Sequence, residues 1–384
     1  VRREKTAAAF PRVVHEKIFG RSEAVRTSFE EFLVETLGAP AESFPCALGV
    51  RVRLARNLAG MPFPCRADAA VRSAAAEKIV AAAERLPAFG DAFRFDVSAL
   101  SAPRRNFLVE RHFISPDLDG AGSGVLILRF RDAALMFNEE DHLRLQVFAG
   151  GNDFGAAWAK AREIDRALAE TLDFAFSEKY GFLTSCPTNA GTGLRISAML
   201  HLPGLVMEGQ MEKILRALDA VGLTARGCFG EDSETRGCIF QISNEHTLGI
   251  SEAETLALMR RWTDDIVEQE LAARRRIFAR ERGRFADRIA RAYGTLRFAV
   301  SLSSDEATEL LSLLRAACDA DLFPAGTRER VDELLLETGA AHIACRASLR
   351  GEFCDAEREN LLRGRMFRET LSAVRPPRFQ DFLK

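Results

Sequence analysis

The chain has 384 residues, with 53 basic and 55 acidic side chains, so its formal net charge is −2, and 47% of its residues are hydrophobic. This balance excludes a histone-like or polybasic nucleic-acid binder, because such proteins need a strongly positive field. Charged residues interrupt the apolar runs well before the roughly 20 residues needed to cross a bilayer, and the length predicts two or three domains.

The first 45 residues are predicted to form an extension that is partly helical. Residues 1–19 are basic and contain no apolar signal core, which predicts a protein that is not secreted. Residues 22–38 form an amphipathic run that stops at a glycine followed by Ala-Pro, as a helix would. Eight cysteines without C-x-x-C spacing indicate reduced thiols rather than a disulfide framework or a zinc site. Together these features predict a cytoplasmic protein.

Between residues 44 and 251 the pattern predicts mixed helices and strands. The strands are rich in β-branched and aromatic residues and are bounded by turn formers. We expect strands at 124–130, 134–138, 181–185 and 237–243, and helices at 71–86 and 152–178.

From Ser251 onward only helices are predicted. Ser251 and Glu254 form a capping box at the start of a highly charged segment that keeps apolar residues at helical spacing as far as residue 293. Further helices are expected at 304–317, 327–338 and 355–372.

The first segment that could carry chemistry is RVRLARN, residues 51–57. Alternation along an extended segment puts Arg51 and Arg53 on one side and apolar residues on the other. Two guanidinium groups on one face suit a polyphosphate. Taken alone, the segment is better explained as an edge strand with a polar face. Arg56 falls out of step with the other two arginines and has no assigned role.

The second segment is NEEDHLR, residues 138–144, directly after an apolar run. Three adjacent acids at the end of a buried strand favour a site for a metal, a cation or a cationic substrate. A solvated turn explains the same pattern equally well. His142, beside three carboxylates, is interpreted as a structural hydrogen-bonding partner and not as a catalytic base.

The third and fourth segments are CPTNAGTGLR, residues 186–195, and RGCFGEDSE, residues 226–234. The third places a glycine-containing loop, whose backbone N–H groups could approach a phosphate, before Arg195. It lacks the GxxxxGK[ST] pattern, which excludes a P-loop NTPase. The fourth again pairs an arginine with an acid across glycines. The four segments thus offer arginines for phosphates and carboxylates for a cationic group.

With these segments laid out, the sequence resembles the phosphagen kinase (guanidino phosphotransferase) superfamily, and within it the bacterial protein-arginine kinases. The matching segments occur in the family's order between about residues 46 and 250: RVRLARN, NEEDHLRLQ, CPTNAGTGLR, RGCFGE and QISNEHTLG. The resemblance implies an α+β fold, in which a catalytic domain with a mostly antiparallel sheet flanked by helices precedes an all-helical C-terminal domain. The implied division is an extension at 1–45, a catalytic domain at 46–275 and a helical domain at 276–384.

The activity that the resemblance implies is ATP-dependent phosphorylation of a guanidinium group. Phosphoryl transfer depends on alignment and on electrostatic stabilisation, which arginines and Mg²⁺ held through the ATP phosphates would supply. Paired carboxylates can orient one guanidinium nitrogen and accept its proton, with a thiolate beside them. The family's pattern assigns phosphate binding to Arg51, Arg53, Arg144, Arg195 and Arg226, guanidinium binding to Glu140 and Glu231, and the reactive thiol to Cys186.

The arrangement of domains bears on the substrate. Kinases of creatine and free arginine begin with a helical domain of about 100 residues, a normal domain size. Here the catalytic region starts near residue 46 and a long helical C-terminal region follows, which favours arginine side chains of proteins as the substrate. In the family that region supports dimerisation and carries an Arg-Asp pair that recognises phosphoarginine. The nearest match is Arg358-Glu359, with glutamate in the aspartate position, and a charged helical surface is the simpler interpretation.

The resemblance therefore implies a cytoplasmic protein-arginine kinase that uses ATP and Mg²⁺ and acts as a homodimer in stress response and protein quality control. In the family, arginine phosphorylation marks proteins for a ClpC–ClpP protease and inactivates a heat-shock repressor, with a zinc-binding activator protein as partner. Neither nucleic acid nor a membrane is expected as a partner. Two alternatives remain: a kinase of free arginine or another small guanidine, and a weakly active adaptor that binds phosphoarginine. The intact set of arginines, glutamates and cysteine argues against the adaptor.

Overall fold

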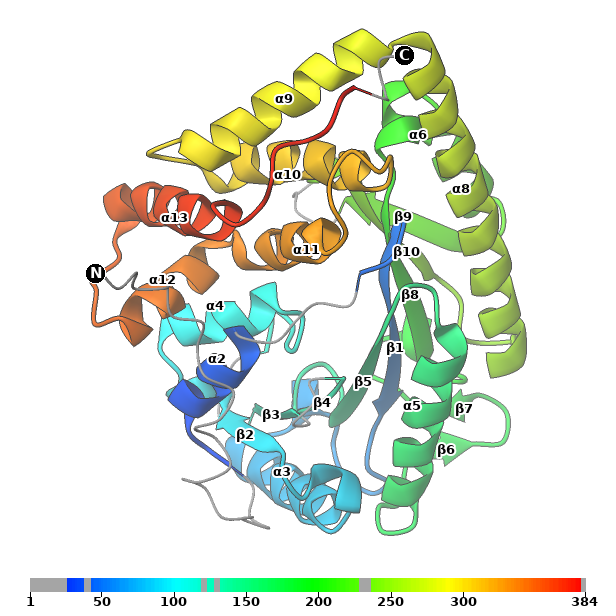
Figure 1. Ribbon diagram of the computed structural model, residues 1–384. Helices are drawn as coiled ribbons and strands as arrows, with labels where there is room; N and C mark the ends of the chain where they lie inside the picture. The colour runs from blue at the N-terminus through cyan, green and yellow to red at the C-terminus, as the bar shows by residue number, and fades with distance from the viewer. Residues whose placement is uncertain (1–25, 38–42, 119–122, 128–131, 228–235, 381–384) are drawn as a thin grey trace.

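The computed structural model describes residues 26–37, 43–118, 123–127, 132–227 and 236–380. Eight strands form one antiparallel sheet in the order β2-β3-β4-β5-β1-β8-β10-β9, with helices packed around it (Figure 1). The predicted α+β architecture with an antiparallel sheet is confirmed. The strands of this sheet are β1 (Ala47–Arg56), β2 (Phe93–Asp96), β3 (Gly124–Ile127), β4 (Ala133–Phe137), β5 (Leu143–Gly150), β8 (Leu194–His201), β9 (Leu223–Gly227) and β10 (Ile239–Asn244).

The helices fall into two groups along the chain. Up to residue 219 they alternate with strands, and from residue 252 they follow one another without a strand among the described residues, as predicted. The first group comprises α2 (Phe29–Leu37), α3 (Ala69–Glu84), α4 (Ala102–Glu110), α5 (Phe154–Ala169), α6 (Pro203–Met207) and α7 (Met211–Asp219). The second comprises α8 (Glu252–Arg280), α9 (Arg282–Phe298), α10 (Ser304–Cys318), α11 (Thr327–Glu337), α12 (Ala340–Leu349) and α13 (Ala356–Leu371).

Strand β1 lies in the middle of the sheet, hydrogen-bonded to β5 on one side and to β8 on the other. Its apolar side chains Val52 and Leu54 are buried in the core that α5 helps to form. The interpretation of RVRLARN as an edge strand is therefore wrong, because both edges of β1 are paired. Its polar face is real, and it points away from this core.

Two further expectations differ from the structure. The helix predicted at 152–178 ends at Ala169, because the chain then turns back to the end of β1, where the amide of Ala59 donates to the carbonyl of Asp173 (2.8 Å). The next residues form a small hairpin of β6 (Phe176–Ser177) and β7 (Gly181–Phe182), so the strand predicted at 181–185 is short. Helix α12 was not predicted at all.

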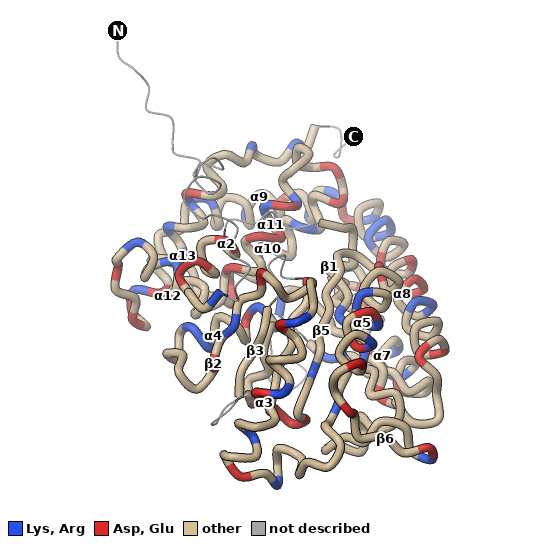
Figure 2. Tube along the Cα trace, turned by 90° about the horizontal axis from the view of Figure 1, so that it is seen from below, with Lys and Arg blue, Asp and Glu red and all other residues tan. Residues whose placement is uncertain are grey.

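The long helix α8 begins with the predicted capping box, in which Ser251 and Glu254 each accept from the other's backbone amide. Charged residues of both signs follow one another along it (Figure 2). It runs without a break through residue 275, where the predicted domain division falls, and that division remains a prediction.

Helices α9 to α13 form their own apolar core, which includes Ile289, Leu311 and Phe367. None of the helices in the described ranges combines the length and the apolar character that a membrane crossing requires.

Helix α2, which lies within the predicted N-terminal extension, packs against the β2 edge of the sheet. Phe32 is completely buried and lies 5.2 Å from Phe93 and 5.3 Å from Phe95, ring centre to ring centre. Phe29 adds a contact with Phe107 of α4. The predicted helix near the start of the chain is confirmed, and it is joined to the apolar core.

A buried network of charged side chains joins the end of β8 to helices α8, α10 and α11. Nδ1 of His201 lies 3.2 Å from Nη2 of Arg274 and 3.4 Å from Nη1 of Arg315. Arg274 pairs with Asp319 (2.5 Å), and Arg315 pairs with Asp332 (2.7 Å). Burial and the two guanidinium groups lower the pKa of His201 well below its usual value, so the imidazole is neutral.

The depressed pKa of His201 predicts a loss of stability in acid. Below a pH of about 6.5 the unfolded chain binds a proton at this histidine that the folded protein excludes, so the free energy of unfolding falls as the pH falls. One such proton changes stability by up to about 1.4 kcal/mol per pH unit. Urea unfolding between about pH 7.5 and 5 is expected to give a shallower dependence for His201→Gln than for the wild type. The matched control His246→Gln, at an exposed histidine, is expected to keep the wild-type slope, and equal slopes for all three proteins would contradict the prediction.

Candidate active site

Five arginines share one face of the sheet because of the strand register. Arg53 on β1 lies directly opposite Arg195 on β8, and Arg144 on β5 lies two pairs further along, opposite Ala55. Side chains at paired positions and at every second position of a strand point to the same face. Arg51, two residues before Arg53, therefore shares this face.

Arg226 joins the same face through the outer strands. It lies opposite Gln241 on β10, and Gln241 lies opposite Met199 on β8, which is in step with Arg195. Nη2 of Arg51 donates to Oε1 of Gln241 (3.2 Å), so this glutamine links the central and outer arginines. The structure thus brings together all five arginines that were predicted to bind phosphate, on a surface that we call the arginine face.

Arg56 belongs to the opposite side of the sheet, which explains why it falls out of step in the sequence. It is buried, and its Nη2 pairs with Oδ2 of Asp165 on α5 at 2.9 Å. Its guanidinium carbon lies 3.6 Å from the ring centre of Phe182, and its Nη1 donates to the carbonyl of Thr192 (3.0 Å). Arg56 therefore connects β1 to helix α5 and to the loop before β8.

The arginine face carries more positive than negative charge. Desolvation lowers the pKa of Arg53 well below its usual value, and the guanidinium groups of Arg51, Arg195 and Arg144 lower it further. Desolvation also lowers the pKa of Arg195, followed by the effects of Arg226 and Arg144. Because arginine stays charged at neutral pH, such a cluster is an anion site, and its bidentate geometry suits phosphates.

The acidic turn after β4 borders the arginine face. Asn138 there adopts a left-handed backbone conformation, with φ 53°. Arg144 pairs with Glu139 (2.8 Å) and donates from Nη2 to Oε2 of Glu140 (3.1 Å). The Glu140 side chain remains 41% exposed, so it can still reach a ligand. Desolvation raises the pKa of Glu140 despite the opposing effect of Arg144, and a hydrogen bond with Cys186 lowers it in part.

The other acid of this turn, Asp141, has a structural role together with Asn57. Oδ1 of Asp141 accepts from Nδ2 of Asn57 (2.6 Å) and from the amide of Ser185 (2.6 Å). His142 is fully buried, and its Nδ1 accepts from the amide of Leu58 (3.1 Å). These contacts tie the acidic turn to the end of β1 and to the segment that leads to Cys186. His142 is therefore placed as the structural partner that the sequence analysis expected.

The loop that carries Cys186 closes over the acidic turn. Sγ of Cys186 lies 3.0 Å from Oγ1 of Thr188, and Nδ2 of Asn189 lies 3.4 Å from Oε2 of Glu140. Thr247 holds the loop from the other side, donating from Oγ1 towards the carbonyls of Thr188 (2.7 Å) and Ala190 (2.6 Å). Glu140 and Cys186, predicted from distant segments, are thus neighbours.

The loop also depends on a glycine. Gly191 has φ +102°, and a Cβ atom there would lie 2.4 Å from the carbonyl oxygen of Thr247. An L-residue with a side chain is unfavourable in this backbone conformation, and the nearby backbone oxygen leaves no room for one. The CPTNAGTG sequence therefore needs glycine at this position to fold against Thr247.

His112 is a residue of this site that the sequence analysis missed. His112 follows α4 and has φ 59°. Gln146 on β5 lies opposite Arg53 of β1, and its Nε2 donates to the carbonyl oxygen of His112 (3.2 Å). Desolvation and the charges of Arg51 and Arg53 lower the pKa of His112 to about 4, so it lies beside them as a neutral imidazole. No spacing or periodicity near residue 112 indicated this position, because it depends on the packing of the loop across the sheet.

Three predicted residues are not part of the geometry described above. Glu231 lies outside the described residues, which stop at Gly227 after Arg226 and resume at 236. Arg358 is exposed on α13, and Glu359 forms an ion pair with the buried Arg363 one turn later. The structure places this pair on the helices after α8 and not on the arginine face.

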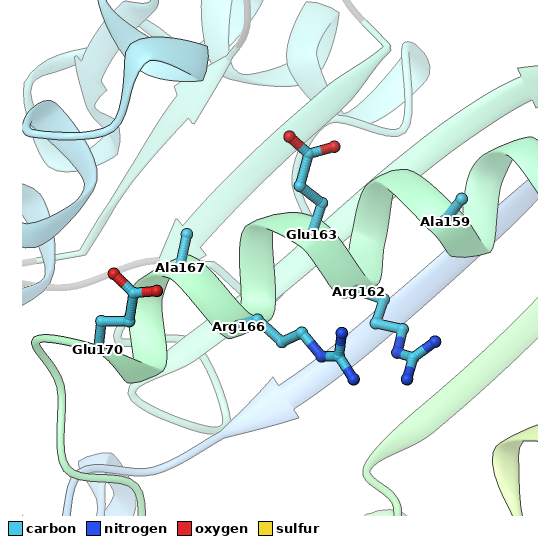
Figure 3. A pocket seen from close by; sticks show the side chains of 6 residues that line it. All are labelled: Ala159, Arg162, Glu163, Arg166, Ala167 and Glu170. Carbon is cyan, nitrogen blue, oxygen red and sulfur yellow. The ribbon is translucent and has the colours of Figure 1, made fainter.

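A shallow hollow on α5 is a different feature. Its lining residues all come from the solvent side of this one helix, where Arg162 and Arg166 point to one side and Glu163 to the other (Figure 3). Helix α5 covers the face of the sheet opposite to the arginine face. The hollow is therefore unrelated to the candidate site.

An antiparallel sheet with an arginine-lined face, a carboxylate and a thiol side by side is suited to phosphoryl transfer between a polyphosphate and a cationic group. Comparison with known families agrees with this class. Residues 75–273 match the ATP:guanido phosphotransferase C-terminal catalytic domain, and residues 282–381 match the protein-arginine kinase McsB C-terminal domain. The chain belongs to the ATP:guanido phosphotransferase family.

Relatives with similarity over most of their length are protein-arginine kinases. That of Halothermothrix orenii is 40% identical over 298 residues, which span 77% of this chain and 85% of the relative. That of Syntrophomonas wolfei is 38% identical over 89% of this chain and 96% of the relative.

Solved structures share the fold at lower sequence identity. A lombricine kinase superposes with a TM-score of 0.54 at 22% identity, covering 64% of this chain and 71% of that protein. The duplicated taurocyamine kinase of Schistosoma mansoni gives a TM-score of 0.53 at 21% identity, covering 88% of this chain and 51% of that protein. These likenesses establish the fold.

Substitution of Gly191 tests the geometry of the Cys186 loop. Gly191→Ala and Gly249→Ala both place a side chain at positive φ, at a cost of about 1–2 kcal/mol, but only at Gly191 does the new atom meet a backbone oxygen. We therefore expect Gly191→Ala to lower the free energy of unfolding by at least about 1 kcal/mol more than Gly249→Ala. It is also expected to slow phosphoryl transfer at least about tenfold, because misplacement of reacting groups is costly. Equal effects of the two substitutions in urea unfolding and in kinase assays would contradict this view of the loop.

Proposed function

We propose that this protein is an ATP-dependent protein-arginine kinase, which transfers the γ-phosphoryl group of ATP to a guanidinium nitrogen of arginine side chains in proteins. The observation that carries the proposal is the juxtaposition of the arginine face with Glu140 and Cys186. One side of the site suits a polyanion and the other suits a cation. The protein-arginine kinases that match most of the chain support a protein substrate.

In this mechanism the arginines bind and align the ATP phosphates. The transition state of phosphoryl transfer is loose and spreads negative charge over the equatorial oxygens, so fixed guanidinium groups stabilise it without reorganisation. The set comprises Arg51, Arg53, Arg144, Arg195 and Arg226. A bound polyphosphate would also relieve the mutual repulsion that, after desolvation, lowers the pKa of Arg53 and Arg195.

The carboxylates act on the acceptor. A protonated guanidinium is a poor nucleophile, so it must be oriented and must lose a proton as the new N–P bond forms and the bond from phosphorus to the β–γ bridging oxygen breaks. In this mechanism Glu140 holds two of its N–H groups, with the Cys186 sulfur beside it. Glu231, by resemblance, would supply the second carboxylate and share the uptake of the proton.

Magnesium is implied by the use of ATP, and the residues fit a metal held by the nucleotide. Glu139 and Glu140 both pair with Arg144, and the described part of the chain contains no group of three or more His, Cys, Asp or Glu side chains that could hold a metal ion. By the family resemblance, Mg²⁺ would bind through the ATP phosphates, whose charge it would neutralise.

The activity is tested by incubating the protein with Mg·ATP and an arginine-rich protein, followed by mass spectrometry for phosphoarginine under non-acidic handling. Phosphoarginine on the protein is the expected result. Transfer only to free arginine would support the small-guanidine kinase instead. Binding of phosphoarginine without any transfer would support the adaptor.

The arginine face is tested by Arg195→Lys. Lysine keeps the charge but loses bidentate contact with a phosphate, so we expect KM for ATP to rise about tenfold or more. Arg216→Lys is the matched control, because Arg216 is an exposed arginine on α7 paired with Glu212. Steady-state kinetics with varied ATP measure both, and an unchanged KM in Arg195→Lys would exclude Arg195 from nucleotide binding.

The carboxylate is tested by Glu140→Gln and by pH. The amide cannot accept the proton, so we expect kcat to fall at least about 100-fold, the usual size of a general-base contribution. Because the pKa of Glu140 is raised, its carboxylate is lost at a higher pH than an ordinary glutamate, and activity should fall as the pH drops through that raised pKa. The residual activity of Glu140→Gln should not show this fall at low pH. Wild-type rates in Glu140→Gln would refute the assignment, and Glu231→Gln tests the second carboxylate in the same assay.

The wider role follows from the resemblance. The proposal places the protein in the cytoplasm, where arginine phosphorylation would mark proteins for a ClpC-type protease or inactivate a stress-response repressor, with a zinc-binding activator.

The proposal also includes the catalytic domain at 46–275 and a helical domain at 276–384, which the separate matches at 75–273 and 282–381 support. Phosphoarginine recognition by Arg358 and Glu359 is part of it, although the pairing of Glu359 with Arg363 engages one carboxylate oxygen.

A homodimer through the C-terminal helices is supported by apolar side chains exposed there. Phe298, the last residue of α9, and Val300 just beyond it are 69% and 67% exposed, and the carbonyl of Val300 lies against Gly364 of α13. Light scattering is expected to show a dimer for the wild type and a monomer for Phe298→Ser/Val300→Ser. Phe176→Ser, at an aromatic residue of the β6–β7 hairpin that is 59% exposed, is expected to stay dimeric. A dimer that survives the double substitution would place the interface elsewhere.

A further inference from the structure

The segment Glu110-Arg111-His112, at the end of α4, touches both the arginine face and a helix of the C-terminal region. We propose that Glu110 and His342 are positioning residues, which hold His112 at the nucleotide site and so make the affinity for ATP depend on helix α12. The inference rests on the proposed function, because it takes the arginine face as the ATP site. Helices α4 and α12 lie side by side (Figure 1).

The contact with α12 is made by hydrogen bonds to Glu110. Its carboxylate accepts from the backbone amides of Ala341 (2.9 Å) and His342 (3.0 Å), and from Nδ1 of His342 (2.5 Å). Nε of Arg111 donates to Nε2 of His342 (2.7 Å). Since Arg111 can only donate, Nε2 of His342 is the acceptor and Nδ1 carries the proton. The neutral imidazole thus joins Glu110 and Arg111.

The fit of Glu110 against α12 is close. His342 is fully buried, and a Cβ atom at Gly339 would lie 2.4 Å from Oε2 of Glu110. Any side chain at Gly339 would therefore displace the carboxylate. Burial lowers the pKa of His342 to about 4, which agrees with its neutral form. We call Glu110, Arg111, His342 and Gly339 the α4–α12 latch.

On the other side, the same segment is fixed to the sheet. Nε2 of Gln146 donates to the carbonyls of His112 (3.2 Å) and Phe113 (2.9 Å), and Gln146 lies opposite Arg53 in the strand register. His112 itself has φ 59°. For a residue with a side chain this conformation costs about 1–2 kcal/mol and persists only where the surroundings enforce it.

The latch and Gln146 hold this segment from two sides, while the positive φ of His112 closes the C-terminal cap of α4, in which the amides of His112 and Phe113 donate to the carbonyls of Val109 (2.8 Å) and Leu108 (2.9 Å). If the latch opens, the end of α4 loses its anchor to α12, and the cap that carries His112 is free to shift on the sheet. The imidazole then leaves the neighbourhood of Arg51 and Arg53. Helix α12 also packs against α13, which carries Arg358 and Glu359, so the latch connects that helix to the nucleotide site.

The experiment measures ATP affinity by calorimetry with the full chain and compares His342→Ala and Glu110→Gln with Ser348→Ala, an exposed control on α12. We expect both latch variants to bind ATP about five- to tenfold more weakly, with kcat at saturating ATP within about twofold of the wild type, as for a change in positioning alone. Ser348→Ala should match the wild type. Thermal unfolding of each variant separates a loss of folding from a loss of affinity.

A double-mutant cycle decides whether the latch acts through His112. His112→Asn removes the imidazole but tolerates positive φ. If the latch works through His112, adding His342→Ala to His112→Asn should weaken ATP binding by less than about twofold. If the effects of His342→Ala and His112→Asn on ATP affinity simply multiply, the proposal that the latch acts through His112 is wrong. It is also wrong if folded latch variants bind ATP as tightly as the wild type. Neither result would contradict the proposed kinase activity. A wild-type protein that binds no ATP would overturn both this inference and the proposed function.

Discussion

The structure depends on the repulsion between arginines that the strand register forces together. Arg53 and Arg195 lie directly opposite each other on neighbouring strands, an arrangement that destabilises a sheet when the charges are alike. The neighbouring Arg144 increases the repulsion, and Glu139 offsets only part of it. In the proposed mechanism, a polyphosphate bound here replaces this repulsion with attraction, so binding of the nucleotide offsets the cost of bringing the arginines together.

The remaining parts of the fold hold this charged face in place. The opposite side of the sheet is apolar and packs on α5. The one arginine of β1 on that side, Arg56, is paired with Asp165 of α5. Asn57 and Asp141 tie the end of β1 to the acidic turn and to the Cys186 loop. The acidic turn and the Cys186 loop are therefore fixed to the same strand that carries two of the arginines.

The C-terminal helices are joined to the catalytic sheet by two buried polar clusters. One surrounds His201 at the end of β8, the strand that also carries Arg195. The other is the α4–α12 latch. Buried charge must be paired, so each cluster fixes one relative position of the elements that it joins. This is the physical basis of the proposed coupling between helix α12 and the arginine face.

The sequence by itself determined the local features: the alternation that separates Arg51 and Arg53 from Val52 and Leu54, the capping box at Ser251, and the motifs that carry the family resemblance. These depend on near neighbours in the chain or on residue identity. Only the tertiary structure decided that β1 is central, that Arg56 faces α5, and that His112 lies beside the arginines. Such facts depend on register and packing between segments far apart in the chain, and the residue pattern of one segment contains no information about its partner.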